Sequence, residues 1–260
     1  MGVVNVTPDS FSDGGEFLDA RAAIAHGKRL VEEGAEILDV GGESTRPGAE
    51  AVSAEEELRR VVPVVEGLAG GGATISIDTS KLAVAEAALD AGAEIVNDVT
   101  ALGADPQIAA LCAERGAGLA LMHMRGEPRT MQRDPHYDDV VDEVKALLAE
   151  RVELAVSAGV PADRIWVDPG IGFGKTVEHN LELLARLGEL RELGCPILIG
   201  TSRKSFLGEL TGAPVEARLG GTIASNVLAY AAGAEVFRVH DVREVREGLT
   251  VAAAILGAPR

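Results

Sequence analysis

The segment TISIDTS, residues 74–80, contains the pattern that decides the fold: a short apolar run ends on Asp78, and a helix-like stretch follows. The same order recurs in GVVN ending at Asn5, EILDVGG at Asp39, EIVND at Asn97 and Asp98, LALMH at His123, IWVDPG at Asp168, ILIGTSRK at Ser202 and Lys204, and VFRVHD at Arg238 and His240. Eight consecutive β-α units predict a closed (β/α)8 TIM barrel that occupies residues 1–260 as a single domain.

The polar residues at the ends of these runs predict the place of the active site. In a (β/α)8 barrel the reactive groups sit at the carboxyl ends of the strands, so these side chains should gather on one face. Two of the strand-to-helix loops, residues 6–18 and 41–52, are long and rich in polar residues and glycine. Loops of this length on a compact barrel usually carry function.

The composition excludes several classes of protein. Hydrophobic residues make up 47% of the chain but aromatic residues only 3%, which predicts a large aliphatic core. The net charge of −17 opposes non-specific binding to nucleic acid, although a local cluster of Arg and Lys can still hold an anion. No apolar run is long enough to span a membrane. Cys112 and Cys195 form neither a disulfide framework nor a metal-ligand spacing, which favours buried thiols in a reducing cytoplasm.

Arg238 and His240 alternate along the last strand end, with Val239 between them, so they should point to the same side. Two donor groups at this position suit a phosphate, because the last strands of such barrels often form a phosphate site. The alternative is an ion pair of Arg238 with Asp241 or with an acid from a neighbouring loop.

Asp78, Asn97 and Asp168 should supply acceptors and an amide near the barrel axis, at the ends of the third, fourth and sixth strands. A heterocycle that presents several N–H groups, like a guanidine, would pair with them. The alternative for Asp78 is a helix N-cap within Asp78-Thr79-Ser80.

Asn5 is the ligand-type residue of the first strand, and Thr7, Asp9 and Ser10 follow it with further oxygen atoms. This set could bind Mg2+, which typically takes one or two protein oxygens together with waters and substrate phosphates. Ser205 should fall near the start of the helix after the seventh strand, where free N–H groups and the helix dipole favour an anion. The alternative for Ser205 is an ordinary serine N-cap.

The segment DPGIGFGKT, residues 168–176, is similar to a nucleotide-binding P-loop but lacks its first glycine, since Pro169 stands there. We therefore expect no nucleotide binding. The glycines should instead let the backbone approach a flat ligand, with Phe173 over it.

Several long segments match one known family in order along the chain. They are NVTPDSFSDGG (5–15), GGESTRPG (41–48), IDTSK (77–81), VNDV (96–99), LMHM (121–124), DPGIGFGK (168–175), SRKSFLG (202–208) and RVHDV (238–242). Together they resemble the dihydropteroate synthase family. Members usually carry a short segment before the first strand, and its absence is the one departure from the pattern.

The resemblance implies a homodimeric enzyme of folate biosynthesis that uses Mg2+ and joins 7,8-dihydropterin-6-ylmethyl diphosphate to p-aminobenzoate. It implies a pterin pocket of Asp78, Asn97, Met122, Asp168 and Lys204. It implies a diphosphate site of Asn5, Arg238 and His240, with Asn5 also reaching the metal. It implies a p-aminobenzoate side of Phe11, Thr45, Arg46, Pro47, Phe173 and Ser205. The catalytic roles fall to Asp78, Lys204, Arg238 and His240.

Two other functions remain open at this point. A pterin-binding methyltransferase domain of corrinoid-dependent enzymes is a related barrel, but it needs no grip on a diphosphate. The intact GGESTRPG and SRKS motifs favour the synthase. A non-catalytic pterin-binding homologue should have lost loop or phosphate-binding residues, and none of them is missing here.

Overall fold

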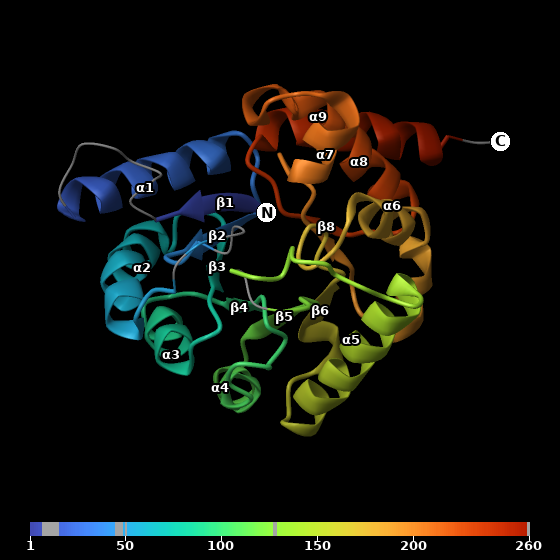
Figure 1. Ribbon diagram of the computed structural model, residues 1–260. Helices are drawn as coiled ribbons and strands as arrows, with labels where there is room; N and C mark the ends of the chain where they lie inside the picture. Colours follow the sequence, from blue (N-terminus) through green and yellow to red (C-terminus); the bar gives the residue numbers. More distant parts are fainter. Residues whose placement is uncertain (7–15, 45–48, 50, 127–128, 259–260) are drawn as a thin grey trace.

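The computed structural model describes residues 1–6, 16–44, 49, 51–126 and 129–258, in which strands and helices alternate along the chain (Figure 1). The strands are β1 (Gly2–Asn5), β2 (Ile37–Gly41), β3 (Thr74–Asp78), β4 (Ile95–Asp98), β5 (Gly118–Met122), β6 (Ile165–Asp168), β7 (Leu198–Ile199) and β8 (Val236–Phe237). The helices are α1 (Glu16–Glu32), α2 (Ala54–Leu68), α3 (Leu82–Asp90), α4 (Gln107–Arg115), α5 (Val140–Ser157), α6 (Val177–Ala185), α7 (Ser205–Thr211), α8 (Leu219–Ala231) and α9 (Val242–Leu256). Short 3-10 turns lie at η2 (Ala162–Arg164), η3 (Leu187–Leu193) and η4 (Val215–Ala217).

The strands form a ring. The first six pair in parallel in the order β1-β2-β3-β4-β5-β6, and β7 pairs with β8. Isolated parallel bridges between Val167 and Ile197 and between Gly2 and Val239 join the two groups. At the second junction the Val3 N–H donates to the Val239 carbonyl over 3.1 Å. With the helices arranged around the strands (Figure 1), the predicted (β/α)8 barrel is confirmed.

The core lies between the ring and the helices. Successive side chains of a strand point to opposite faces, so one set meets the helices while the other faces the barrel axis. Leu38 and Val40 of β2 and Ile75 and Ile77 of β3 are buried in the same apolar cluster as Leu68 of α2. These aliphatic side chains, with few aromatic ones, make up the core that the composition predicted.

The polar side chains of neighbouring strands lie in register at the barrel axis. Asp39 of β2 pairs with Ser76 of β3, and Asp78 at the end of β3 pairs with Asn97 of β4. The expectation that each polar residue ends its strand is wrong for Asp39, because β2 continues to Gly41. Asp39 therefore lies one layer deeper in the barrel than Asp78.

Asp98 was expected beside Asn97 at the strand end, but it has a local structural role. Its carboxylate accepts hydrogen bonds from the N–H of Thr100 over 2.8 Å and from the N–H of Leu102 over 2.7 Å. Alternation along β4 explains the difference, since adjacent residues face opposite sides of the sheet. Asp98 thus holds the turn after β4.

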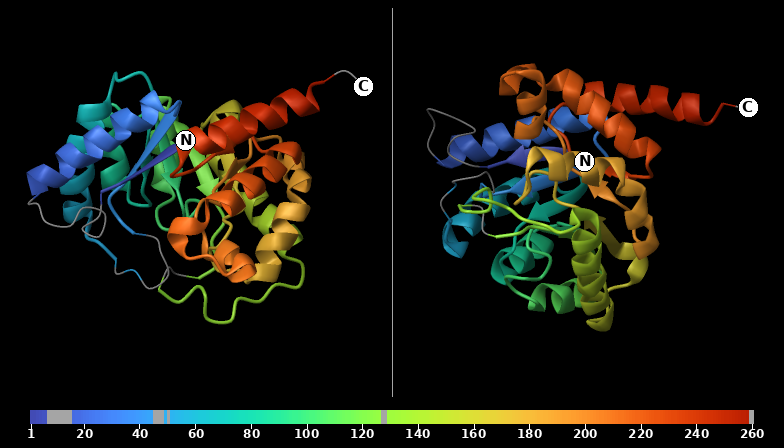
Figure 2. Two further views of the ribbon diagram at one scale, coloured as in Figure 1. Left: turned by 90° about the horizontal axis from the view of Figure 1, so that it is seen from above. Right: turned by 45° about the vertical axis from the view of Figure 1, so that its right-hand side comes forward.

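The last two long helices lie next to each other, and in both views of Figure 2 the end of α9 extends beyond the barrel. Gly248 of α9 is packed so closely against α8 that an added Cβ would lie 2.8 Å from Ile223.

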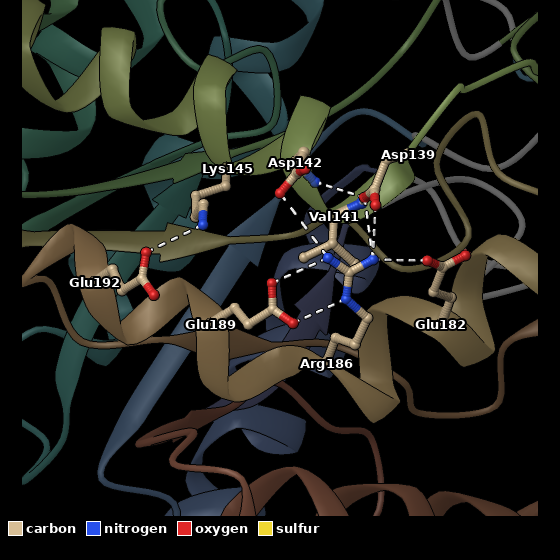
Figure 3. Close-up of polar contacts among 8 residues, drawn as sticks. All are labelled: Asp139, Val141, Asp142, Lys145, Glu182, Arg186, Glu189 and Glu192. Carbon is tan, nitrogen blue, oxygen red and sulfur yellow. Dashed lines mark hydrogen bonds and ion pairs between the residues drawn. The ribbon is translucent and has the colours of Figure 1, made fainter.

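A network around Arg186 fixes the start of α5 (Figure 3). Asp139 caps that helix by accepting from the N–H groups of Val141 and Asp142, each over 2.9 Å. Arg186, at the end of α6, forms ion pairs with Asp139 over 2.9 Å and with Glu182 over 2.8 Å. Exposed pairs of this kind each contribute only about 0–1 kcal/mol, but several share one guanidinium here. They anchor the far end of the long segment that connects β5 to α5.

Candidate active site

One cavity lies at the carboxyl ends of the strands. Its lining residues are Asp78, Asn97, Val99, Met122, Asp168, Phe173, Gly200, Ser202, Lys204, Arg238 and His240. The structure thus brings together, from β3 to β8, the residues predicted for the pterin pocket, Phe173, and the two donors predicted for the diphosphate.

Other predicted residues lie elsewhere. Asn5 ends β1 in register with Gly41 and is half-buried, but it does not line the cavity. Ser205 is exposed and is the first residue of α7, while Lys204 occupies the N-cap position. Ser205 is therefore no N-cap. Four residues predicted for the p-aminobenzoate side lie outside the described residues: Phe11, Thr45, Arg46 and Pro47.

Arg238 reaches across the barrel to two acids. Its Nε donates to Asp39 Oδ2 over 2.6 Å, and its Nη2 donates to Asp78 Oδ2 over 2.7 Å. Burial opposes the charge, but Asp39 and Asp78 outweigh it and raise the pKa of Arg238. Arg238 therefore forms an ion pair, but with acids of β2 and β3 and not with the partners that the alternative named, Asp241 or a loop acid. Asp241 instead pairs with Arg203. Arg238 lines the cavity at the same time.

Asp78 has the pKa of a group that titrates near neutrality. Burial raises its pKa to about 7, Arg238 opposes that shift, and Asp39 adds to it by repulsion. A carboxyl in this state can either accept or donate a hydrogen bond at physiological pH. The helix-cap alternative is not supported, because the N-cap of α3 is Lys81.

Asp168 and Lys204 both line the cavity, and each affects the pKa of the other. Burial raises the pKa of Asp168 while Lys204 opposes this, and burial lowers the pKa of Lys204 to about 8 while Asp168 opposes that. Asp168 accepts a bond from the Gly170 N–H over 2.7 Å. Lys204 donates to the Ile171 carbonyl and lies 4.7 Å from the centre of the Phe173 ring. The amine is thus held against the aromatic side of the cavity.

His240 is oriented by Ser202. The His240 N–H donates to Ser202 Oγ over 3.2 Å, and the same hydroxyl lies 3.0 Å from His240 Nδ1. If the hydroxyl donates to Nδ1, the neutral ring carries its proton on Nε2. With this hydrogen bond, Ser202 fixes the tautomer in which His240 Nε2 is a donor.

A second cavity occupies the opposite end of the barrel. Its lining includes residues where strands begin, such as Ile37 and Val236. Met1 lines it as well, as do Arg246 and Leu249 of α9. In barrels of this type the amino end of the strands serves stability rather than catalysis. The first cavity is therefore the candidate active site.

Comparison with known proteins assigns the family. The chain matches the pterin-binding enzyme family over residues 1–240. It is 47% identical to the dihydropteroate synthase of Escherichia coli K12 over 259 residues, which cover 99% of this chain and 92% of that protein. The chain belongs to the dihydropteroate synthase family. It is therefore a transferase of folate biosynthesis, as its motifs led us to expect.

Solved dihydropteroate synthases have the same fold. The Xanthomonas albilineans enzyme with 4-aminobenzoic acid superposes with a TM-score of 0.93 at 50% identity, covering 100% of this chain and 93% of that one. The same enzyme in complex with 7,8-dihydropteroate gives 0.89 at 48% identity, covering 100% and 94%. The Yersinia pestis enzyme in a sulfonamide drug complex gives 0.93 at 44%, covering 99% and 94%.

Asp39 supports the site from beneath, a role that its place near a strand end did not by itself predict. It is fully buried and accepts bonds from Ser76 Oγ over 2.6 Å, from Asn97 Nδ2 over 3.1 Å and from Arg238 Nε over 2.6 Å. Asp39 lies two residues before Gly41, the end of β2, and residues two apart on a strand share a face. This spacing is the feature of the sequence that could have placed Asp39 at the barrel axis. Asp39 therefore orients residues of both predicted halves of the site.

Two glycines of the segment after β6 lie so close to the backbone after β5 that no side chain would fit there. A Cβ on Gly170 would lie 1.9 Å from the His123 carbonyl oxygen, and one on Gly174 would lie 2.2 Å from that of Arg125. Both glycines have positive φ, which side chains rarely adopt. These two glycines admit the close approach of the backbone that follows β5, and the predicted approach of a flat ligand to this segment stays a prediction. Lys175 is buried beneath this turn rather than presented to a phosphate.

Proposed function

We propose that this cavity joins p-aminobenzoate to 7,8-dihydropterin-6-ylmethyl diphosphate. The arylamine nitrogen forms a bond to the methylene carbon, the bond from that carbon to the diphosphate oxygen breaks, and the amine loses a proton. The products are 7,8-dihydropteroate and pyrophosphate. One observation carries the proposal: two buried acids and an amide line the same cavity as Arg238 and His240.

The acids and the amide suit the pterin ring. Asp78, Asn97 and Asp168 offer acceptors for the N–H groups of its aminopyrimidinone edge, and Lys204 offers a donor for its carbonyl and ring nitrogen. Met122 is buried and supplies an apolar wall. Carboxylates beside the ring would also stabilise positive charge that develops as the diphosphate leaves.

Arg238 and His240 suit the leaving diphosphate. Charge-assisted bonds from a guanidinium to phosphate oxygens are strong and directional. Asp39 and Asp78 hold the guanidinium at the cavity wall. The arginine is thus pre-positioned, and the pterin diphosphate would compete with Asp78 for one edge of it. The aromatic amine is neutral at physiological pH and needs no strong base.

Mg2+ is proposed as the metal of this reaction. Among the described residues, no three His, Cys, Asp or Glu side chains are grouped so that they could hold an ion by themselves. This fits Mg2+, which binds through one or two protein oxygens and substrate phosphates. The Asn5 side chain at the end of β1 would hold it. When bound, the ion would neutralise charge on the diphosphate.

Phe173 and Ser205 are proposed for the p-aminobenzoate side, together with Phe11, Thr45, Arg46 and Pro47. Phe173 presents its ring at the cavity beside Lys204. Ser205 begins α7, where backbone N–H groups lack helical partners and can bind a carboxylate.

One assay tests the function. The chain is mixed with the pterin diphosphate, p-aminobenzoate and Mg2+, and pyrophosphate release is followed with and without the arylamine. Release that depends on p-aminobenzoate is expected. Methyl transfer from a methylated pterin would instead identify a corrinoid-dependent methyltransferase domain, and pterin binding without either reaction would identify a non-catalytic homologue.

A homodimer is proposed to form through α8 and α9. These neighbouring helices expose large apolar side chains: Leu228, Val251, Ile255 and Leu256. Exposed apolar clusters on helices that pack together are typical of subunit interfaces. Light scattering should show a dimer for the parent and a monomer for Ile255→Glu. Leu154→Glu on α5, which removes an exposed leucine elsewhere, is the matched control.

A cytoplasmic location is also proposed. Cys112 and Cys195 are free and buried, as expected for a reducing compartment. In the part of the chain that the structure describes, no helix is both long and apolar enough to cross a bilayer.

A further inference from the structure

Lys175 is a buried lysine at the end of the turn that follows β6, and the reaction proposed above does not use it. Its exposed fraction is 3%. Its Nζ lies 2.9 Å from His123 Nδ1, 3.0 Å from the Phe173 carbonyl oxygen and 3.5 Å from the His123 carbonyl oxygen. Three acceptors around one nitrogen match the three donors of an ammonium group. The side chain therefore links the end of β5 to the turn after β6.

The two segments that Lys175 links are also packed backbone against backbone. The glycine contacts described above bring the turn against the carbonyls of His123 and Arg125. Gln132 Nε2 donates to the Gly172 carbonyl over 2.6 Å, and the Tyr137 hydroxyl donates to the Gly174 carbonyl over 2.9 Å. The turn thus has several hydrogen-bonding partners, and among them Lys175 and Tyr137 are buried.

The turn carries two residues of the cavity. Asp168 precedes it, and the His123 N–H donates to the Asp168 carbonyl over 2.9 Å. Phe173 lies within it, and its carbonyl accepts from Lys175. A change at Lys175 therefore reaches the cavity through His123 and Phe173.

Charges near Lys175 bear on its protonation and on that of Asp168. Burial lowers the pKa of Lys175 well below its usual value, Lys204 and Arg125 add to this, and Asp168 opposes it. Burial raises the pKa of Asp168, which Lys204, Lys175 and Arg238 oppose. Burial also lowers the pKa of His123 to about 3, so its ring is neutral and can accept at Nδ1.

We propose that Lys175 is a positioning residue of the pterin pocket: through the hydrogen bonds of its buried Nζ to His123 and to the Phe173 carbonyl, it holds Asp168 and Phe173 in the geometry that binds the ring. This inference rests on the proposed function of the cavity. It also assigns a role to the lysine of the segment that is similar to a P-loop.

The test compares Lys175→Met with the parent and with Lys145→Met. Methionine retains the length and apolar stem of lysine but leaves the three acceptors without the Lys175 donor. Lys145 pairs with Glu192 on the outer side of α5, so its variant controls for loss of a positive charge. Calorimetry measures the binding of the pterin diphosphate with Mg2+ between about pH 5 and 9, a range that covers titration of the raised carboxyls.

In Lys175→Met, pterin affinity at neutral pH should fall by about tenfold or more, the effect of losing one charged hydrogen-bond network. The pH below which binding is lost should also rise. The sign follows because Asp168 binds as a carboxylate, and removing a nearby positive charge raises its pKa further. Lys145→Met should match the parent. An affinity within about twofold of the parent, or weaker binding with an unmoved acid limb, overturns the proposal.

A second pair of variants covers the outcome that Lys175→Met does not fold, as judged by circular dichroism. His123→Leu removes the acceptor of Lys175, while His123→Asn keeps an acceptor near the position of Nδ1. The asparagine variant should recover most of the affinity that the leucine variant loses. Equal affinities in the two overturn the proposal. If the parent binds the pterin diphosphate but releases no pyrophosphate with p-aminobenzoate, the proposed function fails while the positioning role stands.

Discussion

Arg238 and Asp39, which are 199 positions apart in the chain, meet in a hydrogen-bonded ion pair of 2.6 Å at the barrel axis. Asp39 is fully buried and also binds Ser76 and Asn97. The pair connects the second strand to the last one, across the junction where the barrel closes. This buried carboxylate contacts both the arginine proposed for the diphosphate and an amide proposed for the pterin, so it couples the two proposed halves of the site.

Asp39→Asn should therefore lower kcat/KM, although Asp39 does not line the cavity itself. The amide keeps the shape but cannot form a charged bond to Arg238, a loss of about 1.5–3 kcal/mol, or about ten- to a hundredfold in kcat/KM for the pterin diphosphate. Ser76→Ala, which removes only the hydroxyl bond to the same carboxylate, should cost less. Steady-state kinetics of both variants measure this, and equal losses would contradict the role of the charge.

Asp168→Asn should damage pterin binding much more than pyrophosphate binding. A carboxylate accepts two N–H bonds from an aminopyrimidinone edge, whereas an amide offers one acceptor and one mismatched donor. The cost should be about 1.5–3 kcal/mol. Calorimetry with each ligand separately gives the comparison, and a pterin affinity equal to that of the parent would count against the assignment.

The pH dependence of pterin binding should follow Asp78 on the acid side and Lys204 on the alkaline side. Burial raises the pKa of Asp78 to about 7, so its carboxylate form is gained as pH rises through that value. Burial lowers the pKa of Lys204 to about 8, so its cation is lost above that pH. kcat/KM for the pterin substrate should be bell-shaped. Because burial also raises the pKa of Asp168, Asp78→Asn should move the acid limb rather than abolish it, and a limb that persists unchanged would assign it to Asp168 alone.

Asn5→Ala should weaken Mg2+-dependent binding of pyrophosphate while the fold stays intact. The substitution removes the side-chain oxygen proposed as a metal ligand at the end of β1 and should leave the strand pairing to Gly41 unchanged. Calorimetric titration of pyrophosphate at several Mg2+ concentrations tests this. An unchanged Mg2+ dependence would show that Asn5 does not reach the metal.

Ser205→Ala should weaken p-aminobenzoate binding only in part. The variant loses a hydroxyl donor but keeps the backbone N–H groups at the start of α7, whose dipole contributes about 0.3–1 kcal/mol. The change should fall mainly on KM for p-aminobenzoate.

The same placement makes a prediction for the parent. Aniline, which lacks the carboxylate, should be a poor substrate, and sulfonamides should compete with p-aminobenzoate. Competition with the pterin diphosphate instead would refute this placement.

The sequence by itself determined the order of the β-α units and which residues end most strands. The length of each apolar run, and the polar residue that ends it, such as Asp78, Asn97 or Asp168, can be read from a few neighbouring residues. This local pattern was enough to predict the barrel and most of the cavity lining. The motifs also identified the family, because they lie within contiguous stretches of chain.

Only the tertiary structure decided what those side chains contact. Asp39 and Asp98 are both acids of predicted strands, yet one faces the barrel axis and the other caps a turn, because the side depends on where each strand begins and ends. The spacing of glycines and lysine in residues 168–176 is similar to a P-loop, but only the tertiary structure shows that Gly170 and Lys175 both contact His123, which follows β5. Contacts between distant segments form when the ring closes, and no local pattern of residues encodes which partners closure will bring together.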